Sequence, residues 1–300
     1  MKQFICSTIL LVFSTKAFCQ DTFSIVAVDT NTMEVGSAGA SCIDGSIIIS
    51  DILPGIGAVH TQSFWNQSNQ ENAHNWMEEG YTAQEIINML INNDAQNNPS
   101  IRQYGIVNFD SGLRSAAYTG DNCYNYKNHI IGPNYAIQGN ILLGQEVIDN
   151  IELNFLNTEG PLYVKLMSAI QGANISGADT RCLQFGTSSL SSFLRIAKEN
   201  DNPDSLYIDI NVNSVDSGIE PLDSLQVLFD NWFISEHPFL NGDVDRDSVI
   251  GILDLLIILD FSLGDQLPSY FQSFPSDFDG NNIINIGDVF HLTNFILDLN

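Results

Sequence analysis

Basic residues are scarce in this chain of 300 residues, which has 10 lysines and arginines against 36 aspartates and glutamates, a formal net charge of −26. Nucleic acids and anionic membrane surfaces are bound through Lys and Arg, so this balance argues against both as partners. Long apolar runs are also missing, because no stretch reaches the roughly 18 apolar residues that a membrane-spanning helix needs. The composition therefore predicts a protein that neither binds nucleic acid nor spans a membrane.

Cysteine is scarce as well, and Cys42, Cys123 and Cys182 are the three that follow residue 19. They lie far apart with no C-x-x-C pair, which argues against a zinc site. In an exported protein one disulfide is expected among them, and the sequence does not choose the pair. Three familiar catalytic signatures are absent too: G-x-S-x-G, H-E-x-x-H and a phosphate-binding glycine loop. His60 falls inside an expected strand and is interpreted as a hydrogen-bonded core histidine.

Residues 1–19 have the pattern of a secretory signal peptide. Lys2 provides the positive start, residues 4–13 form a short apolar run, and small residues precede a cut ahead of Gln20. The protein is therefore expected to be secreted, either extracellular or at the cell surface. Lipidation of Cys19 is the weaker alternative, because its neighbours suit a lipidation box poorly.

Beyond the signal peptide, pairs of expected strands alternate with pairs of expected helices. The strands are expected at 23–29, 34–42, 46–51, 56–62, 103–109, 113–119, 187–197 and 206–212, and the helices at 71–79, from Thr82 onward, at 143–156, 161–170 and 221–232. Most of these strands can pair antiparallel with a neighbour. The predicted class is therefore α+β, a four-layer αββα sandwich over residues 20–236. A segment with Pro238 separates it from a small all-α module over 240–300.

The small module contains a repeated loop, with one copy starting at Asp243 and the other 34 residues later at Asp277. Both copies place oxygen-bearing side chains at loop positions 1, 3, 5 and 12 and a β-branched residue at position 7. Calcium takes six to eight oxygens, and a loop of twelve residues with this spacing surrounds one ion. Two calcium ions are therefore expected, and their binding should contribute to folding. The expected ligands are Asp243, Asp245, Asp247, Val249 and Asp254 in the first loop and Asp277, Asp279, Asn281, Ile283, Asn285 and Asp288 in the second.

The tandem over residues 241–299 resembles a type I dockerin module, which also keeps Asp at position 12. The resemblance implies a cohesin-like protein or a cell-surface scaffold as partner, and a place in an extracellular polysaccharide-degrading assembly as an alternative function. Ser248 and Asn282 stand where Gly is usual at position 6. The positions that face the partner in dockerins are apolar here, which predicts an interface. They are Ile252, Leu253, Ile286 and Gly287.

Six short motifs of the large domain follow the order and spacing of a known family. They lie at 22–27, 55–63, 102–107, 119–120, 138–142 and 177–182. Over residues 22–212 the chain resembles the family catalogued as domain of unknown function 1028. The resemblance implies the αββα fold of the N-terminal-nucleophile hydrolases, and no activity is established for the family itself.

Hydrolases with that fold use a Thr, Ser or Cys as first residue, whose own α-amine is the general base. Thr22 stands directly before the first strand, and two hypotheses stay open for it. The domain is either an amidohydrolase acting on a small extracellular amide or peptide, once Thr22 becomes the first residue, or a binding domain without catalysis. Asp179 and Arg181 would also form a structural ion pair if their segment is extended. The candidate catalytic residues are Thr22, Gln62, Asn140, Asp179 and Arg181.

Overall fold

The structure is a computed structural model that describes residues 22–109 and 114–298. Its strands are β1 Thr22–Asp29, β2 Glu34–Ser41, β3 Ser50–Leu53, β4 Gly57–Ser63, β5 Arg102–Asn108, β6 Ser115–Thr119, β7 Asn128–Ile131, β8 Tyr135–Gly139, β9 Ser191–Ala197 and β10 Ile208–Val212. Its helices are α1 Gln67–Glu78, α2 Ala83–Asn92, α3 Glu146–Asn157, α4 Leu162–Gln171, α5 Pro221–Glu236, α6 Ile252–Leu263, α7 Tyr270–Ser276 and α8 Ile286–Asp298, with short 3-10 helices η1 Ser46–Ile49, η2 Pro99–Ile101 and η3 Thr180–Phe185.

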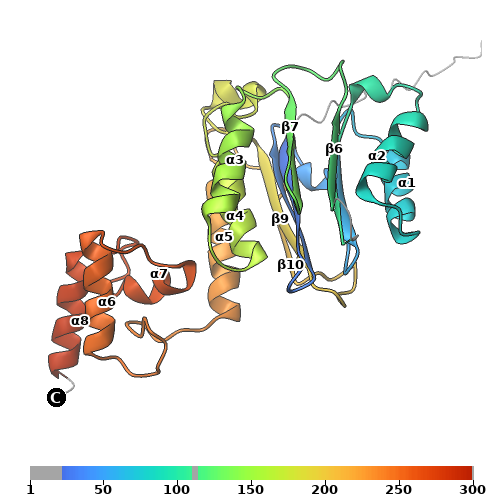
Figure 1. Ribbon diagram of the computed structural model, residues 1–300. Helices are drawn as coiled ribbons and strands as arrows, with labels where there is room; N and C mark the ends of the chain where they lie inside the picture. The colour runs from blue at the N-terminus through green and yellow to red at the C-terminus, as the bar shows by residue number, and fades with distance from the viewer. Residues whose placement is uncertain (1–21, 110–113, 299–300) are drawn as a thin grey trace, which may run out of the picture.

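The strands form two antiparallel sheets, one with the order β10-β9-β2-β1-β8-β7 and one with the order β3-β4-β5-β6. The sheets lie face to face, with α1 and α2 outside the smaller sheet and α3, α4 and α5 outside the larger one (Figure 1). The prediction of a mixed α and β protein with antiparallel sheets is confirmed.

Strand β1 explains why the larger sheet is covered on both faces. Its side chains alternate with the period of two that a strand imposes. Val26 and Val28 belong to a core between the two sheets, whereas Phe23, Ile25 and Ala27 belong to the core under α3 and α4. The neighbouring strand β2 packs directly against α4. At Gly36 there is no room for a side chain, because an added Cβ would lie 2.2 Å from Leu166 Cδ1 of α4. Both faces of this sheet are therefore filled by neighbouring elements.

Several local predictions can be compared with the structure. The helix expected from Thr82 onward is confirmed as α2, and a capping box begins it: Glu85 N donates to Thr82 Oγ1 at 3.2 Å, and Thr82 N donates to Glu85 Oε2 at 2.9 Å. The strand predicted at 46–51 is wrong in its first part, because residues 46–49 form η1. The extended segment considered for Asp179 and Arg181 is also wrong, because Asp179 caps η3. Strands β7 and β8 and helix α7 have no counterpart among the predicted elements.

The C-terminal helices have a small core of their own, made by Val244, Ile258, Phe261 and Leu292. Helix α7 instead contacts α5 of the larger part through aromatic rings. Among the described residues, no helix is long and apolar enough to cross a membrane. The predicted signal peptide at 1–19 and the turn between the strands predicted at 103–109 and 113–119 lie outside the described residues.

Candidate functional site

The first described residue, Thr22, is buried at the start of β1. It pairs with Ser41 of β2, and its neighbour Phe23 pairs with Gly139 of β8. The main-chain nitrogen of Thr22 donates to Asn140 Oδ1 at 3.3 Å, and its carbonyl oxygen accepts from Asn140 N at 3.1 Å. Asn140, directly after β8, therefore binds the Thr22 main chain on both sides.

A glutamine from the other sheet also reaches Thr22. Gln62 of β4 donates from Nε2 to the Thr22 carbonyl oxygen at 3.2 Å and to Gln103 Oε1 at 2.7 Å. Its Oε1 accepts from Ser24 Oγ at 2.7 Å. Buried side-chain amides need hydrogen-bond partners. The partners of Gln62 belong to both sheets, so its amide connects the two sheets at the start of β1.

The residues that follow Gln62 and Asn140 have unusual backbone conformations. Ser63 has a φ of 69° and Ile141 a φ of 54°. A positive φ is an outlier for a β-branched residue such as Ile. The Ile141 main chain is bound on both sides, because its N–H donates to Tyr124 O at 3.2 Å and its carbonyl accepts from Thr180 N at 3.0 Å. Strain that is held in place by surrounding bonds is typical of functional sites.

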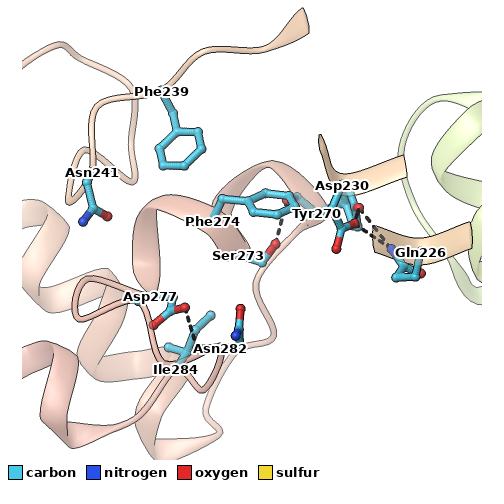
Figure 2. Close-up of a pocket in the computed structure, with 11 residues that line it drawn as sticks. Gln226, Asp230, Phe239, Asn241, Tyr270, Ser273, Phe274, Asp277, Asn282 and Ile284 are labelled. Carbon is cyan, nitrogen blue, oxygen red and sulfur yellow. Dashed lines mark hydrogen bonds between the residues drawn. The ribbon is translucent and has the colours of Figure 1, made fainter. Parts of the chain in front are cut away.

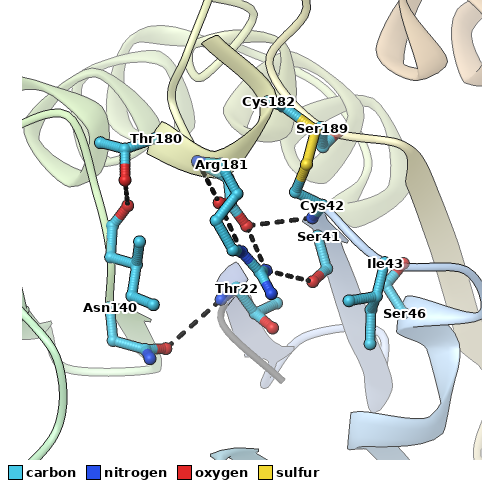
Figure 3. A network of polar contacts seen from close by, with 12 residues as sticks. Thr22, Ser41, Cys42, Ile43, Ser46, Asn140, Thr180, Arg181, Cys182 and Ser189 are labelled. Carbon is cyan, nitrogen blue, oxygen red and sulfur yellow. Dashed lines mark hydrogen bonds and ion pairs between the residues drawn. A yellow bond between two sulfur atoms is a disulfide. The ribbon is translucent and has the colours of Figure 1, made fainter. Parts of the chain in front are cut away.

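Asp179 and Arg181 form an ion pair next to Ser41, the cross-strand partner of Thr22. Arg181 donates from Nε and Nη2 to the two carboxylate oxygens of Asp179 at 3.0 and 2.6 Å. Asp179 is fully buried, whereas the Arg181 side chain is 29% exposed. Arg181 Nη2 is also 3.4 Å from Oγ of Ser41, the cross-strand partner of Thr22. Figure 3 shows the Arg181 side chain extending toward Thr22.

A disulfide fixes this ion pair to the sheet. Cys42, which follows β2, is bonded to Cys182 of η3, and their Cα atoms are 5.7 Å apart. Cys42 N also donates to Asp179 Oδ2 at 3.0 Å. The structure thus selects the pair that the sequence left open. Cys123 lies outside it, and its thiol donates to the Arg102 carbonyl oxygen at 3.2 Å.

His60 is a buried core residue, as interpreted from the sequence. Its Nε2 lies 2.6 Å from Ser37 Oγ, and its Nδ1 lies 3.2 Å from Gln138 Nε2. Burial, and after it the charge of Arg195, lowers the pKa of His60 to about 3, so the ring is neutral at pH 7. It therefore serves the packing between the sheets as a neutral hydrogen-bonding group.

The two C-terminal loops each gather three carboxylates. Ligand-type oxygens of Asp243, Asp245 and Asp247 all lie within 4.8 Å of one another, and so do those of Asp277, Asp279 and Asp288. Asp243 is 6% exposed, and its Oδ1 is buried with no hydrogen-bond partner among the described residues. An unpaired buried carboxylate oxygen is costly, so the first loop fits a cation that would pair with it.

The predicted ligands at positions 5 and 12 also accept hydrogen bonds from the main chain of their loops. At position 12, Asp254 accepts from Val244 N at 2.7 Å and from Gly251 N at 2.8 Å, and Asp288 accepts from Asn285 N at 2.8 Å. At position 5, Asp247 and Asn281 accept from the position-7 N–H groups of Val249 and Ile283 at 2.7 and 2.8 Å. The side chains at positions 5 and 12 therefore hold the turns of each loop.

The predicted partner-binding residues lie on the surface of the C-terminal helices. Ile252, Leu253 and Ile286 are 67%, 63% and 63% exposed. Gly287 follows Ile286 in the first turn of α8. The C-terminal side chains that pack against the core of the larger part come instead from α7, namely Tyr270, Phe271 and Phe274.

Comparison with known proteins gives one family. The model of the family of unknown function DUF1028 matches residues 22–222. The chain belongs to this family. The match ends before the C-terminal loops, and no curated protein matches the chain.

A crystal structure of a DUF1028 protein from Silicibacter pomeroyi is similar, with a TM-score of 0.58 and 17% identity, over 71% of this chain and 89% of that chain. This likeness shows the fold of the DUF1028 domain. The Anbu protein (ancestral beta-subunit) from Yersinia bercovieri aligns with a TM-score of 0.37 and 13% identity, over 74% of this chain and 98% of that one.

The DUF1028 domain brings its five candidate residues into one region. Gln62 and Asn140 bind the main chain of Thr22, and Asp179 positions Arg181 against the strand that pairs with Thr22. Ser41 and Ser63 also belong to this region, because Ser63 Oγ accepts from Asn140 Nδ2 at 3.4 Å. Neither serine is among the candidate residues predicted from the sequence. Ser63 stands next to Gln62 in the same motif, whereas Ser41 is revealed only by the strand register.

Proposed function

We propose that the DUF1028 domain is an amide hydrolase of the N-terminal-nucleophile type, and that its stacked sheets and outer helices are the αββα sandwich of those enzymes. Thr22 is the nucleophile, exposed when residues 1–21 are removed from an exported chain by signal peptidase and trimming. The supporting observation is the hydrogen bond from the Thr22 nitrogen to Asn140 Oδ1, since cleavage turns that nitrogen into the α-amine. The convergence of five candidate residues on this point favours hydrolysis over binding alone.

The chemistry follows from the groups around Thr22. The Thr22 hydroxyl oxygen attacks the carbonyl carbon of a small amide or peptide, and the α-amine accepts the hydroxyl proton. The C–N bond then breaks as the amine returns the proton to the leaving nitrogen, which leaves an ester on Thr22. Water attacks this ester, releases the acid and restores the hydroxyl. Arg181, partly exposed beside Ser41, supplies positive charge for the oxyanion.

The test uses a mature chain engineered to begin at Thr22 and assayed against a panel of acyl amides and dipeptides. Thr22→Ala should lower kcat by several orders of magnitude, the typical cost of removing a nucleophile. Thr22→Ser keeps a hydroxyl and should retain activity. Sequencing the N-terminus of the secreted protein checks the cut directly. Equal rates for wild type and Thr22→Ala, or turnover by neither, would leave a binding domain as the better account.

For residues 240–300 the proposal is a dockerin-like module that binds two calcium ions. Its support is the pair of carboxylate clusters and the unpaired Oδ1 of Asp243. Calorimetric titration of the full chain should find two sites, of which Asp243→Asn and Asp277→Asn should each remove one. Asp265→Asn is the matched control, because Asp265 is an exposed aspartate outside both loops. Titrations without any binding would reject the module as a calcium site.

The partner of this module is proposed to be a cohesin-like protein or a cell-surface scaffold. The exposed apolar residues at the starts of α6 and α8 support an interface, because such patches mark interaction sites. A role in a polysaccharide-degrading assembly would follow only from the identity of that partner. Leu253→Asp should abolish capture of a cohesin domain by the calcium-loaded chain. Unchanged binding would remove this face from the interface.

A further inference from the structure

Helix α7 packs its aromatic side chains against α5, the last helix of the larger part. Phe233 of α5 is fully buried, and its ring centroid lies 4.7 Å from Tyr270, 4.9 Å from Phe271 and 5.4 Å from Phe274. Tyr270 also donates its hydroxyl proton to the Asp230 carboxylate of α5 (Figure 2). The contact therefore combines buried rings with a specific polar bond.

The segment that connects α5 to the first loop is tied to the same place. The His237 ring lies 4.7 Å from Phe233 and 5.2 Å from Phe271, and His237 Nε2 is 3.1 Å from the hydroxyl oxygen of Tyr163. Further along, Gly242 N donates to Pro275 O at 3.0 Å. The connection is therefore bound to α7 rather than running free as a linker.

Both loops contact α7 directly. Asp277 is the C-terminal cap of α7 and also the first position of the second loop, where it accepts from Asn282 N at 2.7 Å. Arg246, at position 4 of the first loop, donates from Nη2 to Phe271 O at 3.2 Å, and its guanidinium lies 4.9 Å from the Phe271 ring. Each loop therefore contains a residue that directly caps or contacts α7.

A cavity of about 570 Å³ separates the second loop from α5. Its lining includes Asp230 of α5, Phe239 and Asn241 of the connection, Tyr270 and Phe274 of α7, and Asp277 of the loop (Figure 2). This cavity opens to the surface, so solvent reaches part of the boundary between the second loop and α5. Contacts between domains of one chain often resemble transient interfaces, which can open.

Each of the two loops brings three carboxylates close together. Three carboxylates within 4.8 Å repel one another, and this repulsion is stronger near a protein surface than in water. A bound cation would replace this repulsion by attraction to its positive charge. Binding would therefore stabilise the conformation in which the loop is closed around the ion. We infer that calcium in these two loops controls the docking of α7 on the aromatic face of α5, so that the module and the DUF1028 domain become one unit only when calcium is bound. This inference rests on the proposed calcium sites.

The experiment uses the full chain, first with chelator and then with calcium. Trp232 is a natural reporter, because it precedes Phe233 and its ring lies 6.3 Å from that of His237. Calcium should shift its emission to shorter wavelength and slow proteolytic cleavage in the segment 237–242 at least tenfold. Trp232→Phe should lose the spectral shift and keep the protection. Two other tryptophans remain in that variant: Trp65 precedes the N-cap of α1, and Trp76 lies within α1.

Two variants separate docking from folding of the module. Tyr270→Phe loses the hydroxyl that binds Asp230 and keeps the ring, and Arg246→Gln loses the cation over Phe271. Calcium should increase the helix signal in circular dichroism of wild type and of both variants, because the loops still fold around the ion. In the variants, however, calcium should slow cleavage at 237–242 less than it does in wild type. A gain of helix with unchanged Trp232 emission and unchanged cleavage in wild type would overturn the inference and leave the calcium sites standing. No calcium binding by calorimetry would overturn both.

Discussion

The main-chain nitrogen of Thr22 and Oδ1 of Asn140 lie 3.3 Å apart, although the two residues are 118 positions apart in the chain. In a chain cut before Thr22, the same oxygen accepts from the α-amine. An acceptor stabilises the protonated form of an amine and so raises its pKa. Asn140 is therefore expected to position the general base and to set the pH at which it becomes neutral.

Asn140→Ala should lower kcat/KM of the mature chain by about 10- to 100-fold, because a hydrogen bond to a charged group is worth about 1.5–3 kcal/mol. The rise of activity with pH should also move to lower pH, since the amine loses a group that favours its charged form. Asn134→Ala is the control, because Asn134 Nδ2 binds Val28 O at 2.7 Å in the same sheet, away from Thr22. A variant with the wild-type rate and pH profile would contradict the role of Asn140.

The disulfide between Cys42 and Cys182 should be a large contributor to stability. It closes a loop of 140 residues and anchors η3, which carries Arg181. Removing it with Cys42→Ser together with Cys182→Ser should lower the free energy of unfolding by about 2–4 kcal/mol, measured by denaturant titration. Reductant should destabilise the wild type and Cys123→Ser alike, because Cys123 lies outside the pair. A reductant effect that disappears in Cys123→Ser would show a different pairing in solution.

Local patterns were predicted well where neighbours in the sequence decide the structure. The capping box of Thr82 and Glu85 is complete within four residues, so it could be predicted from the sequence. Residues 46–49 look like a strand because they contain three isoleucines, yet Ser46 N is bound by Ser191 Oγ at 3.1 Å, 145 positions away. Strand β7 lies at the edge of its sheet, where partly exposed residues give no clear alternation.

The candidate site was predictable in its residue types and less so in its contacts. Thr22, Gln62 and Asn140 each stand in a short motif. Asn140 reaches Thr22 because β8 pairs with β1, whereas Gln62 reaches it from β4 of the other sheet. The contact of Arg181 with Ser41 depends on strand register and on a disulfide across 140 positions. Composition and spacing carry no information on either. The ion pair of Asp179 and Arg181 was predicted for an extended segment. It forms instead at the start of η3, where Asp179 is the N-terminal cap.

His60 should make the protein less stable in mild acid. Its pKa is about 3 in the folded chain and near 6.5 when unfolded, so the unfolded state binds the proton first as pH falls. Stability is therefore complete above pH 6.5 and falls by about 1.4 kcal/mol per pH unit from this group below that pH. Denaturant titrations between pH 7 and 5 should show this slope reduced in His60→Gln, which cannot titrate. Equal slopes in the two proteins would mean that His60 is not buried in the neutral form.

Ser248 should limit the calcium affinity of the first loop. It has a φ of 70° at loop position 6, the left-handed conformation that glycine adopts without a Cβ clash. For an ordinary L-residue this conformation costs about 1–2 kcal/mol, and the greater entropy of an unfolded glycine cancels part of the gain. Ser248→Gly should therefore raise the affinity of the first site by about 0.5–1 kcal/mol, or about two- to fivefold, in calorimetric titration of the full chain.

The matched comparison is Asn282→Gly in the second loop, where φ is 66° at the same position. Asparagine tolerates the left-handed conformation better than serine because its short polar side chain can bond locally, so the gain there should be smaller. Conversely, Gly280→Ala should weaken the second site, because Gly280 has a φ of 73° and alanine brings the Cβ that is disfavoured there. If Ser248→Gly left calcium affinity unchanged while Gly280→Ala reduced it, the backbone of the first loop would not determine its affinity.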